Sequence, residues 1–131
     1  MLVGARAALI RGPSGSGKSR LALELIEAAR AGPLRFARLV GDDRVHLESA
    51  GARLLVRPAP ALAGLIELRG TGLLRLDYEP CAVVGIVVDL DAEDAERLPE
   101  KPRIDINGIT LPRLAVARGD AALPGVLALL T

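Results

Sequence analysis

The sequence predicts an α/β fold in which a mixed sheet, with hairpins, is accompanied by few helices. Three observations support this class. A short apolar run leads into a Gly/Ser-rich turn and then into an amphipathic stretch, as in a strand followed by a helix. The run Ala82–Val88 is rich in β-branched residues and is predicted to be a central strand. Ile104–Leu111 alternates around Asn107-Gly108, which predicts a hairpin.

The first strand and the first helix are predicted from adjacent segments. Ala7–Ile10 is a short apolar run that ends at a Gly/Ser cluster, as a buried strand does before a turn. Lys18–Ala31 has a helical repeat, and Gly32-Pro33 is a typical helix stop. The apolar stripe of this helix consists of Leu21, Ala22, Leu25, Ile26 and Ala29.

The middle of the chain is predicted to form strands and turns. Phe36–Gly41 is expected to be a second strand, and Val45–Glu48 is expected to form a hairpin with Arg53–Arg57. Ala61–Leu76 is interrupted by glycines. We therefore expect mainly loop and turn there, with a short strand near Leu73–Leu76.

The remaining segments give weaker signals. Asp91–Leu98 is compatible with a short helix, and Pro99–Pro102 is expected to be a charged surface loop. The residues after the last hairpin show only a weak apolar pattern. Since no repeat or second domain is recognisable, residues 1–131 are predicted to form one domain.

Composition and charge exclude several classes of function. The net charge is +1 and only 2% of the residues are aromatic, which argues against a nucleic-acid-binding protein. The single cysteine, Cys81, cannot form an internal disulfide and is expected to be a small buried hydrophobe. No apolar run approaches the roughly 18 residues that span a bilayer, and no signal peptide is recognisable. We therefore expect a cytoplasmic protein without nucleic-acid or membrane partners.

The turn between the first strand and the first helix matches the phosphate-binding pattern G-x-x-x-x-G-K-S/T. Glycines let successive backbone N–H groups point at phosphate oxygens, and the helix N-terminus adds partial positive charge. Lys18 would reach the β- and γ-phosphates, and the Ser19 hydroxyl would bind Mg²⁺. A turn that merely links strand to helix requires neither residue. The predicted phosphate-binding residues are Gly12, Pro13, Ser14, Gly15, Ser16, Gly17, Lys18 and Ser19.

A site of this kind also needs a carboxylate at the end of a neighbouring strand, and two places qualify. Asp89 directly follows the apolar run that ends at Val88. The adjacent residues Asp42 and Asp43 could divide two roles, one supporting Mg²⁺ and the other accepting a proton. A solvated turn is the plain alternative for this pair, so the residues alone leave the choice open.

Three further polar residues are candidates with weaker support. Glu67 and Arg69 would face the same side of an extended segment, although such a pair is more often a surface ion pair. His46, the single histidine, is expected to be a surface or packing residue.

Three segments together resemble a known family. Gly12–Ser19, Val40–Val45 with its Asp-Asp-Arg, and Glu67–Leu74 with the pattern E-aliphatic-R-G-x-G follow one another at close spacing. The combination resembles the C-terminal catalytic domain of HPr kinase/phosphorylase, in particular its short single-domain proteobacterial form. This resemblance implies a P-loop fold akin to that of phosphoenolpyruvate carboxykinase.

The resemblance implies an ATP-dependent protein-serine kinase that requires Mg²⁺ and phosphorylates HPr, the phosphocarrier of the sugar phosphotransferase system. It also implies phosphate-dependent removal of that phosphate and assembly into a homo-hexamer. Two alternatives stay open: a nucleotide-binding regulatory module without phosphoryl transfer, and a small-molecule P-loop kinase. The first is motivated by the absence of the histidine that the family usually has shortly before the first strand.

The same resemblance assigns roles to the polar residues. The pair Asp42 and Asp43 would supply the base and part of the metal shell, with Asp43 favoured slightly as the base. Glu67 would support Mg²⁺ through water, and Arg69 would lie near the transferring phosphoryl group or hold Glu67. Asp89 is then left without assigned chemistry.

Overall fold

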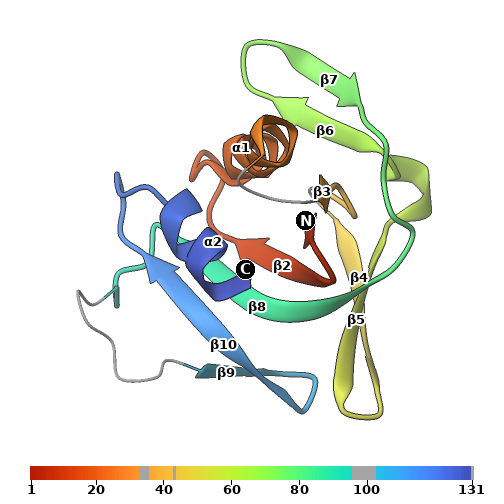
Figure 1. The fold of residues 1–131 in the computed structure, drawn as a ribbon, viewed down its shortest axis with the longest axis vertical. Helices are drawn as coiled ribbons and strands as arrows, with labels where there is room; N and C mark the ends of the chain where they lie inside the picture. Colours follow the sequence, from red (N-terminus) through yellow and green to blue (C-terminus); the bar gives the residue numbers. More distant parts are fainter. Residues whose placement is uncertain (33–35, 43, 96–102, 131) are drawn as a thin grey trace.

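The structure is a computed structural model that describes residues 1–32, 36–42, 44–95 and 103–130 (Figure 1). Its strands are β1 (Leu2–Val3), β2 (Arg6–Arg11), β3 (Ala37–Arg38), β4 (Val45–Ala50), β5 (Arg53–Pro58), β6 (Leu65–Leu68), β7 (Gly72–Arg75), β8 (Ala82–Leu90), β9 (Arg103–Ile106) and β10 (Ile109–Val116). Its helices are α1 (Lys18–Ala31) and α2 (Leu123–Leu130), with a 3₁₀ turn η1 at Pro60–Leu62.

The main sheet is mixed and has the strand order β3-β1-β2-β8-β10-β9, with the β4–β5 hairpin attached through β5 to β8. The neighbours β2, β8 and β10 run parallel, and Arg11 of β2 is in register with Asp89 of β8. The carboxyl ends of these three strands therefore meet at one edge of the sheet. That edge is where ligands bind in open α/β sheets.

Strand β8 is the centre of two apolar layers. Val88 packs in one cluster with Leu25 of α1, Ile66 of β6 and Val126 of α2. Val87 packs in the other cluster, to which β4 and β5 contribute. Successive strand residues point to opposite faces, so a strand covered on both sides reads as one continuous apolar run. This explains why the central position of β8 could be predicted correctly.

The hairpin β6–β7 corrects the prediction of mainly loop for Ala61–Leu76. It pairs Leu65–Leu68 with Gly72–Arg75 apart from the main sheet and lies on the same side as α1 (Figure 1). Gly64, Gly70 and Gly72 all have positive φ values, between 77° and 102°. These glycines bound the strands and form the turn between them, which explains why the apolar pattern is broken at their positions.

Helix α2 was not predicted, because Pro124 and Gly125 near its start are poor helix formers. Tertiary packing explains why the helix forms. Val126 is completely buried, and a Cβ on Gly125 would approach a methyl group of Leu114 to 2.8 Å. Gly125 thus permits a close approach of α2 to β10, and a larger residue there would require the Leu114 side chain to move.

Other expectations had mixed outcomes. The helix α1 and the hairpins β4–β5 and β9–β10 are confirmed. The second strand is shorter than predicted, since only Ala37–Arg38 is strand and Leu39 forms an isolated bridge.

The predicted helix at Asp91–Leu98 is wrong for its described part, where residues 91–95 form turns, and its remainder and Pro99–Pro102 lie outside the described residues. Cys81 is exposed, contrary to expectation, because it lies just before β8 begins. Within the described residues, no helix has the length and apolar character needed to cross a membrane.

Candidate functional site

The predicted phosphate-binding turn follows β2 and continues directly into α1. Gly15 and Gly17 have φ values of 83° and 95°, in the left-handed region that favours glycine. Gly17 is the N-cap of α1, and no side chain caps the N–H groups of the first turn. Those N–H groups and the helix dipole therefore form a positive surface suited to an anion.

Gly12 lies so close to Ser16 and Leu90 that there is no room for a side chain at this position. A Cβ at Gly12 would lie 2.5 Å from Ser16 Oγ and 3.2 Å from Leu90 Cβ. The carbonyl oxygen of Gly12 accepts a hydrogen bond from Lys18 Nζ at 2.8 Å, so the amine is held at the turn. Ser16 Oγ is buried and has no hydrogen-bond partner among the described residues. The turn thus holds the Ser16 hydroxyl and the Lys18 ammonium group next to its backbone N–H groups.

Asp42 connects the turn to the β6–β7 hairpin. Its Oδ1 accepts a hydrogen bond from Ser19 Oγ at 3.0 Å, and its Oδ2 accepts one from the Glu67 N–H at 2.9 Å. Three residues from different sequence motifs therefore meet at one carboxylate. The adjacent candidate, Asp43, lies outside the described residues.

Arg69, which directly follows β6, reaches the same turn. Its guanidinium nitrogens lie 3.6 and 3.8 Å from the position that a Cβ on Gly15 would occupy. The Glu67 side chain is exposed, while the Glu67 backbone N–H donates a hydrogen bond to Asp42. His46 is exposed in β4, as predicted for a surface residue.

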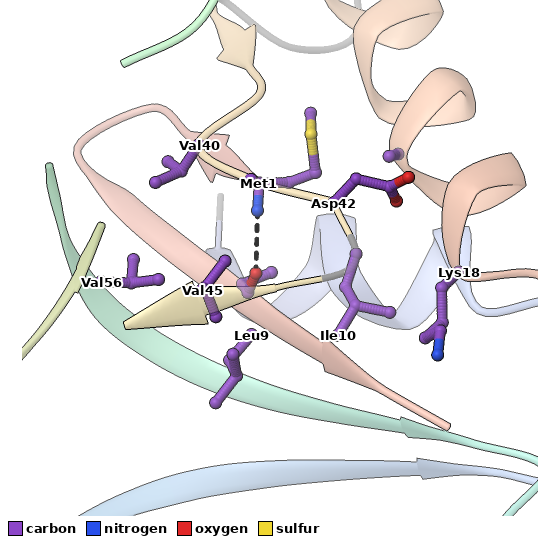
Figure 2. Close-up of a pocket in the computed structure, with 11 residues that line it drawn as sticks. Met1, Leu9, Ile10, Lys18, Val40, Asp42, Val45 and Val56 are labelled. Atoms are coloured by element: carbon purple, nitrogen blue, oxygen red, sulfur yellow. Dashed lines mark hydrogen bonds between the residues drawn. The ribbon is translucent and has the colours of Figure 1, made fainter. Parts of the chain in front are cut away.

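A cavity of about 50 Å³ lies beside the turn, and Lys18 and Asp42 both contribute to its lining (Figure 2). The two side chains point in different directions in Figure 2. Burial lowers the pKa of the Met1 amine, which also lines the cavity, to about 5, so that amine is uncharged at neutral pH. This volume suits water and is far too small for a nucleotide. A phosphate chain would therefore bind on the outer surface of the turn.

The donor set fits Mg²⁺ bound together with phosphates. The hydroxyl of Ser19 and the carboxylate of Asp42 are oxygen donors 3.0 Å apart. No group of three or more His, Cys, Asp or Glu side chains within the described ranges could hold a metal by itself. Mg²⁺ is commonly bound by one or two protein oxygens plus substrate phosphates, so this arrangement is the expected one.

Asp89, the other candidate carboxylate, is bound to arginines. Arg11 binds it through two hydrogen bonds of 2.7 and 2.9 Å, and Arg113 binds it at 2.6 Å. Arg113 in turn binds Asp94 through bonds of 2.7 and 3.0 Å. We call these four residues the charge network. Arg11 and Asp89 lie at the carboxyl ends of β2 and β8, Arg113 lies in the middle of β10, and Arg11 immediately precedes Gly12.

The network shifts the pKa of Asp89. Burial acts to raise it, but the hydrogen bonds and charges of Arg11 and Arg113 outweigh burial and hold the pKa below its ordinary value. The pKa of Arg113 is raised, first by its bond to Asp94 and then by its bond to Asp89. Asp89 is therefore ionised at neutral pH and paired on both oxygens, a structural arrangement that the sequence analysis did not foresee.

We expect Asp89→Ala to lower the free energy of unfolding by roughly 1–2 kcal/mol at pH 7, because it leaves two partly exposed arginines without their shared partner. The pKa of Asp89 is depressed in the folded state. Its contribution is therefore complete above the ordinary aspartate pKa of about 3.9 and is lost as the pH falls through the lower folded value. Urea unfolding of both proteins from neutral to strongly acidic pH measures this difference.

Asp77→Asn is the matched control for that measurement, since Asp77 is exposed and forms no ion pair with another described residue. It should leave the free energy of unfolding within about 0.5 kcal/mol of the parent value. A destabilisation by Asp89→Ala that stays constant down to pH 2 would contradict the electrostatic explanation.

Comparisons with known proteins agree with the resemblance in the motifs. The family model for the HPr Serine kinase C-terminal domain matches residues 3–79. HPr kinase/phosphorylase of an Exiguobacterium species is 36% identical over 107 residues, which cover 76% of this chain and 32% of that protein. The HPr kinase/phosphorylase of Geobacillus thermodenitrificans is 34% identical over 121 residues, covering 82% of this chain and 37% of that protein. The chain thus spans about a third of the length of these curated relatives.

A solved structure, that of the Hpr(Ser) kinase/phosphatase from Coxiella burnetii, has the same fold. It matches with a TM-score of 0.76 and 21% sequence identity, over 97% of this chain and 82% of that one. The predicted fold class, an α/β P-loop fold with a mixed sheet and few helices, is confirmed.

Proposed function

Because the chain belongs to the HPr Serine kinase C-terminal domain family, we propose that it transfers the γ-phosphoryl group of ATP to a serine of an HPr-like phosphocarrier. The observation that supports this most is the position of Asp42. Its carboxylate joins Ser19 of the phosphate-binding turn to the backbone of Glu67. The three segments on which the resemblance rests therefore form a single site.

The phosphates of ATP would bind to Gly12–Ser19 and to the first turn of α1. Lys18 would donate to β- and γ-phosphate oxygens from its position beside the Gly12 carbonyl. Ser16, whose hydroxyl is buried without a described partner, would gain an acceptor from a phosphate oxygen. These donors are fixed before the substrate arrives, which favours electrostatic catalysis.

Ser19 and Asp42 would hold Mg²⁺, and Glu67 would support it through water. When bound, the ion would neutralise negative charge on the β- and γ-phosphates. The Asp42 carboxylate also fixes the Ser19 hydroxyl by accepting a hydrogen bond from it, so the hydroxyl oxygen keeps lone pairs free for a cation.

In the transfer step, the hydroxyl oxygen of the partner's serine attacks the γ-phosphorus. The bond between that phosphorus and the bridging oxygen of ADP breaks, and the serine proton passes to a carboxylate. We assign this base to Asp43, because both oxygens of Asp42 already accept hydrogen bonds. Arg69 would stabilise charge on the transferring group from its position over Gly15.

The reverse reaction would use the same residues. Inorganic phosphate would accept the phosphoryl group from phosphoserine and form pyrophosphate, and the carboxylate would return its proton to the serine oxygen. We propose that the protein acts in the cytoplasm and regulates the sugar phosphotransferase system. We also propose that it assembles into a homo-oligomer, which the family resemblance implies is a hexamer. It includes no nucleic-acid or membrane partner.

The test is incubation of the chain with Mg²⁺, γ-labelled ATP and a cognate HPr, followed by intact-mass analysis of HPr. One phosphate should appear on one HPr serine. Lys18→Ala should reduce the rate at least about 100-fold, because it removes a charged donor to the transferring group. Arg30→Ala, at the far end of α1, is the control and should leave the rate unchanged.

ATP binding without phosphate on HPr would contradict the kinase proposal and support a regulatory nucleotide-binding module. Phosphate on a small metabolite in place of HPr would support a small-molecule kinase.

A further inference from the structure

A second cavity, of about 320 Å³, lies where β10 ends and the chain turns into α2. Its lining is almost entirely small or aliphatic, with Leu114 and Val116 from the strand and three alanines from the segment after it. The one charged residue in the lining is Asp120. A concave site of this size, lined by small and aliphatic residues with one charged side chain among them, can receive part of a small molecule.

The cavity opens at the same sheet edge as the phosphate-binding turn. Val116 in its lining is paired with Leu90 of β8. Leu90 is also the residue whose Cβ lies 3.2 Å from the position of a Cβ on Gly12. Two strand spacings of about 4.8 Å therefore separate the cavity from the turn, roughly 10 Å in all. The ribose and α-phosphate of a nucleotide would bridge a gap of this order.

Helix α2 contributes Gly125 to the lining of the cavity. It packs against α1 and β8, and in Figure 1 it lies beside the end of β2 that leads into the turn. The fit of Gly125 against Leu114 fixes its distance from β10. Val116 and Ala122 of the lining also belong to the core cluster in which the fully buried Val126 anchors α2.

Asp120 is available to a ligand. Its backbone N–H is bonded to the Ala117 carbonyl at 3.0 Å, which fixes the turn, while its side chain is exposed. Its carboxylate forms no ion pair with another of the described residues. An ionised carboxylate only accepts hydrogen bonds, so it would select a ligand with an N–H or O–H donor.

We propose that this cavity receives the purine base of the nucleotide whose phosphates bind to Gly12–Ser19, with Asp120 accepting a hydrogen bond from the exocyclic amino group. The inference rests on the proposed function and adds a base-selecting residue to it. Adenine has an amino donor at position 6, whereas a carbonyl acceptor stands there in hypoxanthine. Asp120 would therefore favour adenine nucleotides and repel inosine nucleotides.

The experiment compares binding of ADP, IDP and tripolyphosphate to the protein by titration calorimetry in Mg²⁺. ADP should bind at least about tenfold more tightly than IDP, the value of one hydrogen bond to a charged group. Asp120→Asn should bring this ratio close to one, because an amide can donate as well as accept. Asp105→Asn, near the opposite end of β10, is the control and should keep the parent ratio.

A second variant tests the cavity itself. Ala121→Leu adds a larger side chain to the lining and should weaken ADP and IDP alike while leaving tripolyphosphate unaffected. An unchanged ADP to IDP ratio in Asp120→Asn, or unchanged ADP affinity in Ala121→Leu, would overturn the inference and leave the proposed function intact. If neither ADP nor tripolyphosphate binds to the parent protein, the proposed function is overturned together with this inference.

Discussion

Asp42→Asn is expected to lower kcat for phosphoryl transfer by roughly 100-fold or more while raising the KM for ATP only a few-fold. Asparagine can still accept the Glu67 N–H bond and donate to Ser19 Oγ, so the geometry at this carboxylate survives. The negative charge of Asp42, which the proposed metal shell requires, is lost. Steady-state kinetics with HPr as acceptor, at several ATP concentrations, separate the two parameters.

Two companion variants make this result decisive. Asp43→Asn should reduce kcat to a similar degree, since we assign the base to Asp43. Asp89→Asn should reduce thermal stability but leave most of the activity. Both carboxylate oxygens of Asp89 are paired with Arg11 and Arg113, so they take no part in the transfer step. Full activity in both Asp42→Asn and Asp43→Asn, with none in Asp89→Asn, would show that the carboxylates are assigned wrongly.

Arg69→Ala is expected to lower kcat by roughly 1,000-fold, because arginines that stabilise a transferring phosphoryl group typically contribute a factor of about this size to kcat. Its guanidinium lies against the face of the turn at Gly15, where substrate phosphates would bind. The effect should fall mainly on kcat, since charge on the transferring group is redistributed most strongly in the transition state. Single-turnover measurements of phosphoserine formation give the rate of the chemical step directly.

Arg69→Lys should recover part of the lost rate, because lysine keeps the charge but lacks the planar fork of donors. Arg75→Ala is the matched control, since Arg75 is another exposed arginine of the same hairpin, in β7. An Arg69→Ala enzyme with parental kcat would place Arg69 outside the chemistry and leave it a surface residue.

Local signals explain what could be predicted. The spacing of Gly12, Gly17, Lys18 and Ser19 specifies the turn, and a regular apolar stripe specifies α1, without reference to any distant residue. The Asn107-Gly108 turn is equally local, and Asn107 adopts the left-handed conformation that such hairpins require.

The features that escaped prediction depend on strand order. Arg11 and Asp89 are 78 positions apart in the sequence and meet because β2 and β8 are parallel neighbours. One signal was available: Arg113 is a charged residue within an otherwise apolar strand, and such a residue needs a partner. The residues alone left the choice between Asp42 and Asp89 open, and the family resemblance favoured Asp42, whose carboxylate lies beside Ser19.

The attachment of the β6–β7 hairpin has a consequence for how activity is controlled. The hairpin stands apart from the main sheet and is held by buried Ile66 and by the bond between Asp42 and the Glu67 N–H. It supplies both Glu67 and Arg69, so one local opening would remove both from the site together. The measured rate would then equal the intrinsic rate multiplied by the fraction of molecules with the hairpin docked. Under the proposed function, a contact that stabilised the docked hairpin would therefore raise the rate without touching the phosphates.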